Sequence, residues 1–150
     1  MKTPPNDYLK YWRVIRYYVK AKHDLTQADL DIILFLYSES YFSKKDFDRY
    51  SEIVSWDIGR FDRLHASGWI ETFRRKMPKT GDYLYQLSYK ATRLVLDIYR
   101  KLNGEEIPTS LSSNPMFLKN VSYSDKVYRN MIIEMNAYYR KKRDEKKGGG

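Results

Sequence analysis

One stretch of the chain, residues 43–90, switches between helical and strand patterns in an order that few folds share. Ser43 and Asp46 have the spacing of a capping box, in which each side chain accepts from the other residue's backbone amide, and they predict the start of a short helix. After a tight turn, Ser55 is a favourable N-cap for a second helix, and Gly68 suits the left-handed residue at which a helix ends. The sequence therefore predicts two consecutive helices joined by a turn.

A strand, a loop and a second strand are predicted directly after these helices. Apolar residues alternate within residues 69–73 and 83–87, as in the strands of a hairpin, and the intervening residues 74–82 include proline and glycine. Ser88 then caps a further helix, whose apolar residues recur at helical spacing as far as Leu102. This order of elements predicts a winged helix-turn-helix, a mainly α fold of the α+β type with a three-helix core and a β-hairpin wing.

Two helices are predicted before this unit. The first spans Tyr8 to Lys22, and the second follows a capping box formed by Thr26 and Asp29. The second helix is apolar on nearly every side and should therefore be buried. The inward stripe predicted for the first helix consists of Leu9, Trp12, Ile15 and Val19.

The remainder of the chain is predicted to be a linker and one more helix, which runs from Ser122 to about Arg143. The expected division is a winged-helix domain at 1–104, including the N-terminal helix and the long fifth helix, a linker at 105–121, and a C-terminal helix with a basic tail at 122–150. The last helix cannot bury its apolar stripe alone, so the terminal helices are expected to pair in a homodimer. The inward residues predicted for it are Val127, Met131, Ile132, Met135 and Tyr139.

The composition limits the classes of function. The 150 residues, 42% of them hydrophobic, suit a globular protein, and no apolar run is long enough for a membrane span or a signal peptide, so a cytoplasmic location is expected. The absence of cysteine excludes disulfides and cysteine nucleophiles. The two histidines, His23 and His65, are far apart in the predicted fold, and no catalytic triad or glycine-rich phosphate loop is present. No catalytic residue, metal or cofactor is therefore expected, and the protein is not expected to be an enzyme.

The net charge of +9 favours an anionic partner, but its distribution is uneven. Residues 25–70 carry a net charge of −3, whereas residues 71–103 carry +5. The predicted helix-turn-helix is therefore acidic, and the basic character lies on the predicted wing and on the flanking helices.

Three segments resemble the MarR-type family of winged-helix regulators: LTQADLDIIL at 25–34, LHASGWI at 64–70 and LSYKA at 87–91. The order of elements is similar to that of the family over about residues 8–104. The resemblance implies a dimeric transcriptional regulator that binds operator DNA. It also implies that small aromatic ligands release the protein from the operator. The Asp-x-Arg wing motif of the family is absent from this sequence.

The fourth helix, which is expected to enter the major groove, supplies part of the candidate DNA-binding set. Arg60 is expected on its outer face, where it can pair with guanine, and Ser55 is placed to contact phosphate. Arg63 is expected to join them, or to neutralise Asp62 or Asp46 instead. The sequence alone does not decide whether the arginines of this helix contact DNA bases or neutralise nearby acidic side chains.

Trp56 and two lysines complete the candidates outside the wing. Trp56 is expected either to anchor a protein partner or to fold back on Tyr50. Lys44 and Lys45 open the third helix, where cations oppose the helix dipole, and their position is consistent with an external phosphate.

The predicted wing loop is the most basic short segment of this unit. Four cations lie around its turn, with only Asp82 opposing them, and a polyanion contact is favoured over a merely solvated loop. These cations are Arg74, Arg75, Lys76 and Lys79.

Double-stranded DNA is thus the expected partner, and a dimeric regulator the expected role. The alternative is a phage-type structural or protein–protein interaction module that reuses the winged helix, in the cytoplasm or in a virion. The acidic fourth helix, an exposed Trp56 and the C-terminal helix as a docking arm favour that alternative. A sequence-neutral architectural DNA binder lies between the two.

Overall fold

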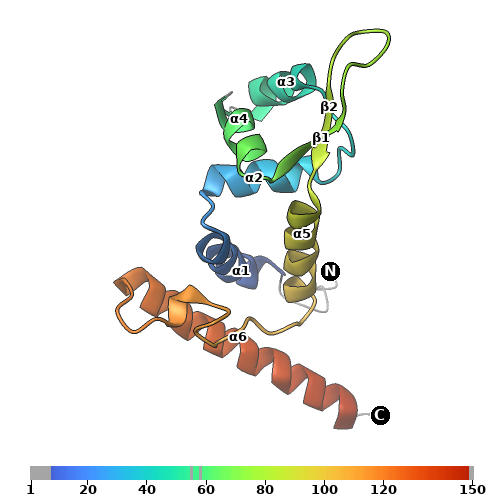
Figure 1. Cartoon of the computed structure of the whole chain (residues 1–150). Coiled ribbons are helices and arrows are strands. Elements are labelled where there is room, and N and C mark those ends of the chain that lie inside the picture. The colour runs from blue at the N-terminus through green and yellow to red at the C-terminus, as the bar shows by residue number, and fades with distance from the viewer. Residues whose placement is uncertain (1–7, 55, 58, 149–150) are drawn as a thin grey trace. The chain divides into compact units, whose positions relative to one another are not determined.

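The computed structural model describes residues 8–54, 56–57 and 59–148 of the chain. These residues belong to two compact units, Thr26–Leu96 and Met1–Leu25 together with Asp97–Gly150. We call the first the wing unit and the second the terminal unit. Helix α5 (Tyr89–Leu102) begins in the wing unit and ends in the terminal unit (Figure 1).

Three helices open the wing unit: α2 (Gln27–Leu36), α3 (Lys44–Val54) and α4 (Gly59–Ala66). Both predicted capping boxes are confirmed. The Thr26 hydroxyl accepts from the Asp29 amide at 3.1 Å, and the Asp29 carboxylate accepts from the Thr26 amide at 3.3 Å. Ser43 and Asp46 exchange the equivalent bonds at 3.1 and 3.0 Å. The backbone amides that a helix N-terminus leaves without partners are thereby satisfied at α2 and α3.

Helix α4 is shorter than the sequence predicts. It begins at Gly59 instead of Ser55, and the Asp57 carboxylate accepts from the Gly59 amide at 3.1 Å. Ser55 and Ile58 lie outside the described residues. Gly68 has a φ of +85°, which confirms the left-handed residue predicted after the helix.

The wing is an antiparallel hairpin of β1 (Ile70–Arg74) and β2 (Leu84–Leu87). The register pairs Thr72 with Tyr85 and then Arg74 with Leu84, so a bulge leaves Phe73 without a direct cross-strand partner. Phe42 forms an isolated antiparallel bridge with Tyr85, with backbone bonds of 3.0 and 2.8 Å. The bridge attaches the hairpin to the segment between α2 and α3.

The wing loop is closed by its own backbone. The Met77 amide donates to the Asp82 carbonyl at 2.7 Å, and the Gly81 amide donates to the Met77 carbonyl at 2.8 Å. Lys76 and Gly81 both have left-handed φ values, of 48° and 73°, which turn the chain at each side of the loop. The loop therefore has a defined shape at the end of the hairpin (Figure 1).

The core of the wing unit draws on α2, α3, α4, β1 and α5. Its aromatic centre joins three elements: the Phe61 ring lies 5.2 Å from the ring of Phe47 and 4.8 Å from that of Tyr85, both in edge-on arrangements. The winged helix-turn-helix and its mainly α, α+β class are confirmed by these elements. The buried apolar side chains include Leu30, Ile33, Leu36, Phe42, Phe47, Phe61, Leu64, Ile70, Leu94 and Val95.

In the terminal unit, α1 (Tyr8–His23) packs against α6 (Tyr123–Gly148) through tyrosines. The Tyr11 ring lies 5.5 Å from that of Tyr138, and Tyr17 stacks on Tyr128 at 3.9 Å. The stripe predicted for the first helix is confirmed at Ile15 and Val19 and wrong at its start: Leu9 is 90% exposed and Trp12 only half-buried, because tyrosine rings take part of the inward face. The buried residues of α1 are Tyr11, Val14, Ile15, Tyr18 and Val19.

The segment for which the sequence predicts a linker contains a short 3-10 helix at Pro115–Phe117 and packs on α6. Asn136 on α6 exchanges two hydrogen bonds of 2.9 Å with the backbone of Ile107, and both residues are buried. Of the inward residues predicted for the last helix, Ile132, Met135 and Tyr139 are buried, whereas Val127 and Met131 are exposed. Among the residues that the structure describes, no helix has the length and apolar character needed to cross a bilayer.

Candidate nucleic-acid interface

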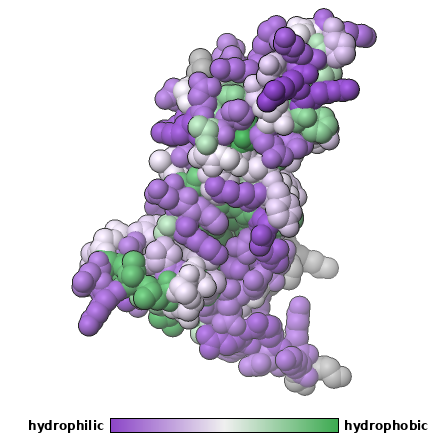
Figure 2. All heavy atoms as spheres, in the orientation of Figure 1, coloured by the Kyte–Doolittle hydropathy of each residue, from purple (hydrophilic) through white to green (hydrophobic). Residues whose placement is uncertain are grey.

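The cations of the wing, Arg74, Arg75, Lys76 and Lys79, form what we call the wing cluster. All four are exposed, and in the described part of the chain none of them forms an ion pair. Figure 2 shows strongly hydrophilic side chains over the wing loop. Because the loop is held by internal backbone bonds, the cluster is presented on a pre-formed turn, and its charge is available to an external anion.

The two lysines at the start of α3 have internal partners. Lys44 Nζ lies 3.5 Å from an Asp62 carboxylate oxygen, and Lys45 Nζ lies 3.9 Å from one of Asp82. Such exposed pairs contribute little stability, about 0 to 1 kcal/mol. The two lysines do partly neutralise Asp62 beside α4 and Asp82 beside the wing. Without the lysines, these carboxylates would repel a polyanion at both places.

The arginines of α4 converge on one buried carboxylate. Arg60 Nη1 donates to Asp29 Oδ1 at 3.0 Å and to the Thr26 hydroxyl at 3.2 Å, and Arg63 Nη2 donates to the same Asp29 oxygen at 3.2 Å. Asp29 is only 6% exposed, whereas the Arg63 side chain is 56% exposed. Arg63 therefore has a carboxylate partner, but it is Asp29 and neither of the two considered from the sequence.

The pKa of Asp29 shows which influence prevails at this contact. Burial by itself raises the pKa of the carboxyl group, but hydrogen bonds from Thr26 and Arg60 and the charge of Arg63 outweigh burial. The pKa of Asp29 is consequently below its ordinary value. The carboxylate is charged at neutral pH and fastens α4 to the first turn of α2.

Trp56 folds back on its own unit. Its ring lies edge-on to Phe35 at 5.1 Å and 5.5 Å from the ring of Phe47, and it is half-buried. The sequence left two roles open for Trp56, a protein anchor or packing against Tyr50. In the structure Trp56 packs within its own unit, but against these two phenylalanines instead of Tyr50. Ile53, at the end of α3, is 73% exposed.

The structure brings six of the ten predicted residues together in two groups, leaves Lys44, Lys45 and Trp56 outside them, and does not describe Ser55. The wing cluster shares one loop, and the two arginines share Asp29. The sequence did not identify Asp29 as part of the site. Its position in a capping box predicts only the local hydrogen bond with Thr26, three residues earlier. No sequence signal links it to residues more than thirty positions later.

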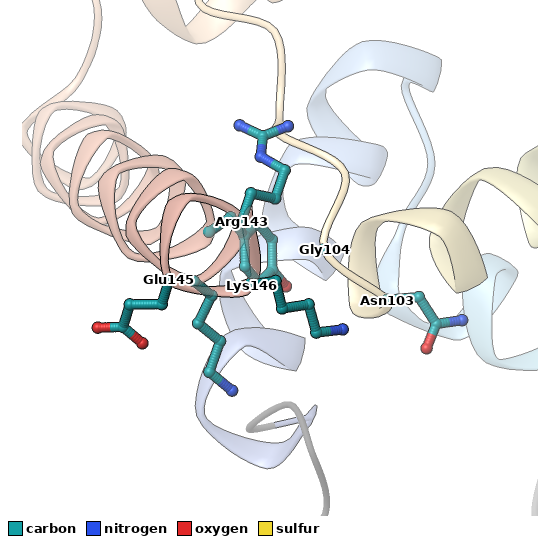
Figure 3. Close-up of a pocket in the computed structure, with 7 residues that line it drawn as sticks. Asn103, Gly104, Arg143, Glu145 and Lys146 are labelled. Atoms are coloured by element: carbon teal, nitrogen blue, oxygen red, sulfur yellow. The ribbon is translucent and has the colours of Figure 1, made fainter. Parts of the chain in front are cut away.

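A pocket of about 480 Å³ lies in the terminal unit, between the end of α5 and the last turns of α6 (Figure 3). Asn103 and Gly104 line it on one side, and Arg143 and Glu145 project in different directions from α6 on the other. Arg143 and Arg140 both bind the Glu106 carboxylate, and the hydrogen bond from Arg143 does most to lower the pKa of Glu106. The pocket contains charged residues, but part of this charge is neutralised internally.

Comparison with known proteins gives structural similarities only. No family model matches the chain, and no curated protein matches it. A mutant of MarR from E. coli complexed with operator DNA is 17% identical, with a TM-score of 0.46 over 83% of this chain and 84% of that one. Wild-type apo MarR from E. coli is 15% identical, with a TM-score of 0.46 over 83% and 87% of the two chains. The reduced form of the same protein is 19% identical, with a TM-score of 0.42 over 83% and 86%.

These similarities are weak, and the fold stands on the elements of the chain itself. Helices α2, α3 and α4, the hairpin β1–β2 and the following α5 occur in the order of a winged helix-turn-helix. The wing cluster lies at the tip of that hairpin.

Proposed function

We propose that this protein binds double-stranded DNA through its winged helix-turn-helix and acts as a transcriptional regulator. The observation that carries the proposal is the wing cluster: four exposed cations at the end of β1 and on the pre-formed loop that follows it, without internal ion pairs among the described residues. Each phosphate that such a cation neutralises releases condensed counterions, and this release drives duplex binding. The family resemblance in the sequence supports the same role.

We assign the residues of the interface different tasks. The wing cluster contacts phosphates beside the groove, and Arg63 is the α4 cation with most freedom to reach DNA, since its side chain is 56% exposed. Arg60, which is more buried, orients α4 through Asp29 instead of reading a base. Lys44 and Lys45 offset Asp62 and Asp82, and Ser55 remains a predicted phosphate contact, whereas Trp56 packs within its own unit.

A homodimer is the assembly that we propose. Exposed apolar residues follow one another on α6 at helical spacing, namely Tyr123, Val127 and Met131, and Ile133 is exposed as well. A second copy of the terminal helices would cover this surface, as a two-fold interface requires. Two winged units could then contact successive half-sites of an operator.

The proposal is tested by fluorescence anisotropy on a labelled duplex of random sequence at low ionic strength. The wild-type protein is expected to bind, and the triple variant Arg75→Gln/Lys76→Gln/Lys79→Gln to bind about 100-fold more weakly, at roughly tenfold or less per lost phosphate contact. A matched control removes three exposed lysines of the terminal unit, Lys119→Gln/Lys126→Gln/Lys141→Gln. Equal losses in both variants, or no binding by the wild type, would contradict the proposal.

One observation favours a second candidate, a protein-interaction module. Ile53 is 73% exposed at the end of α3, and Val54 beside it is also exposed. Apolar side chains at that turn are suited to a protein contact and contribute nothing to phosphate binding. If this candidate is correct, Ile53→Ser abolishes a protein complex, and the wing variant leaves that complex intact.

A further inference from the structure

The outward face of the wing hairpin carries an aromatic pair that the proposed duplex contacts do not use. The Phe73 ring stacks on the Tyr41 ring, with centroids 4.2 Å apart and planes 24° apart. Tyr41 is 51% exposed and Phe73 47% exposed, although rings of this size are usually buried. Phe73 shares this face with Glu71, whereas Thr72 and Tyr85 point toward the core.

The bulge in β1 explains how Phe73 comes to this position. Because the register shifts between Thr72 and Arg74, Phe73 has no direct cross-strand partner. Its ring lies on the outward face of the hairpin and stacks there on the ring of Tyr41. Bulges of this kind re-aim a side chain and are common beside functional sites. The arrangement exposes aromatic surface at the point where the strand leads into the basic loop.

A small cavity adjoins the aromatic pair. It has a volume of about 280 Å³ and shares Tyr41 with the stacked pair. The hydroxyls of Ser40 and Thr92 and the amide of Gln86 line it, together with apolar Leu87. The two hydroxyls can donate to or accept from the edge of a heterocycle, Gln86 can accept through its amide oxygen because its Nε2 already donates to Glu71, and the volume suits one planar ring system.

Positive charge lies next to this surface. Arg74 and Arg75 follow Phe73 directly, and neither forms an ion pair in the described ranges. Glu71 lies on the same face but accepts a hydrogen bond of 2.8 Å from the Gln86 amide. Aromatic rings beside cations are the combination that binds single-stranded nucleic acid, because bases stack on the rings and phosphates meet the charges.

We propose that Tyr41, Phe73 and the adjoining cavity bind an unpaired base of a DNA strand that leaves the duplex held by the wing. This inference rests on the proposed function, since the duplex places the strand near the site. It extends that function by assigning the protein a preference for duplex DNA with an open or single-stranded flank. The wing cluster holds phosphates on the duplex side, and the aromatic pair supplies the base contact.

Anisotropy on three matched probes tests the inference: a blunt duplex, the same duplex with a short thymine tail, and the duplex with an abasic tail of equal length. The wild type is expected to bind the thymine-tailed probe about tenfold more tightly than the other two, the gain typical of one or two stacked bases. Phe73→Ala is expected to remove this gain and leave blunt-duplex affinity unchanged. Phe73→Leu, which keeps an apolar side chain, is expected to behave like Phe73→Ala, and Tyr89→Ala, at an exposed tyrosine outside the site, is expected to keep the gain.

The outcomes separate the two proposals. Equal affinity for all three probes would overturn the base site and leave the proposed duplex binding intact. Equal gains from the thymine and abasic tails would overturn it as well, because phosphates alone would explain the gain. Binding of the tailed probe without any binding of the blunt duplex would overturn the proposed function but support the base site. A gain that survives in both Phe73 variants would overturn the assignment to this ring.

Discussion

Two groups of cations in the wing unit have opposite surroundings. The wing cluster is exposed on a loop that projects beyond the hairpin, and its charges have no internal partners among the described residues. Arg60 and Arg63, in contrast, share one oxygen of the buried Asp29. Cations that look alike in the sequence therefore differ in function: one group is available to an external polyanion, and the other fastens two helices.

The contrast also bears on how an acidic helix-turn-helix could take part in the proposed DNA binding. Its ion pairs place arginines beside Asp29 and Lys44 beside Asp62, but the net charge of −3 already includes these cations. The attraction for phosphate comes from the wing. In this account the wing supplies most of the affinity for DNA, and α4 supplies orientation.

The largest effect on stability is expected at the shared carboxylate. Asp29→Ala should lower the free energy of unfolding by about 3 kcal/mol, because it leaves Arg60 without its carboxylate and removes the bond from the Thr26 amide in the capping box. Urea unfolding followed by circular dichroism measures this loss. Asp31→Ala, at an exposed acid of the same helix, is the matched control and should change stability by less than about 0.5 kcal/mol. A similar small change in both variants would show that Asp29 does not fasten α4.

Single arginine variants should separate the two groups. Arg60→Ala is expected to lower the free energy of unfolding by about 1.5 kcal/mol, since it removes charge-assisted bonds to Asp29 and Thr26. Arg75→Ala should leave stability unchanged within about 0.5 kcal/mol and weaken binding of every duplex sequence alike. Unfolding curves and anisotropy on two unrelated duplexes provide both readings. Loss of sequence preference in Arg60→Ala without loss of stability would instead assign base reading to Arg60.

The same residues show what the sequence can and cannot predict. Capping boxes at Ser43 and Thr26 and the left-handed Gly68 depend on neighbours within a few positions, so local patterns are sufficient to predict them. The contact between Asp29 and Arg60 spans more than thirty residues, and it arises only when the folded chain brings α4 beside the first turn of α2. A periodicity argument cannot foresee it.

Two further differences have the same origin. On α1, the predicted stripe included Leu9 and left out Tyr11, but Tyr11 contacts tyrosine rings of α6 and is buried, whereas Leu9 is exposed. The bulge at Phe73 depends on the register of the hairpin, which alternation alone does not specify. In the candidate site, the wing cluster was predictable because it lies in one continuous segment.

The pH dependence of stability gives a smaller effect. The pKa of Asp29 in the folded protein lies below its ordinary value of 3.8, so the folded state favours the charged carboxylate. The stability that this group contributes is therefore fully present at neutral pH and is lost as pH falls below about 4. Urea unfolding at pH 7 and near pH 3 should show a smaller acid-induced loss in Asp29→Asn than in the wild type. Parallel pH profiles of the two proteins would contradict this role.

The smallest effect is expected at the exposed ion pair of α3. Lys44→Ala removes a contact of 3.5 Å to Asp62 between two exposed side chains and should change the free energy of unfolding by less than about 0.5 kcal/mol. Its effect on duplex binding should also be smaller than that of Arg75→Ala, because Lys44 already has a partner. A larger effect on binding than Arg75→Ala produces would move the main phosphate contact from the wing to the start of α3.

The salt dependence of duplex binding tests most directly whether the wing supplies the affinity. The slope of the logarithm of the binding constant against the logarithm of salt concentration is to be measured for the wild type and for Arg75→Gln/Lys76→Gln/Lys79→Gln. If these three cations each neutralise one phosphate, the slope of the variant becomes shallower by about 2.7. An unchanged slope would show that the wing cations do not contact the DNA backbone, and it would contradict the account.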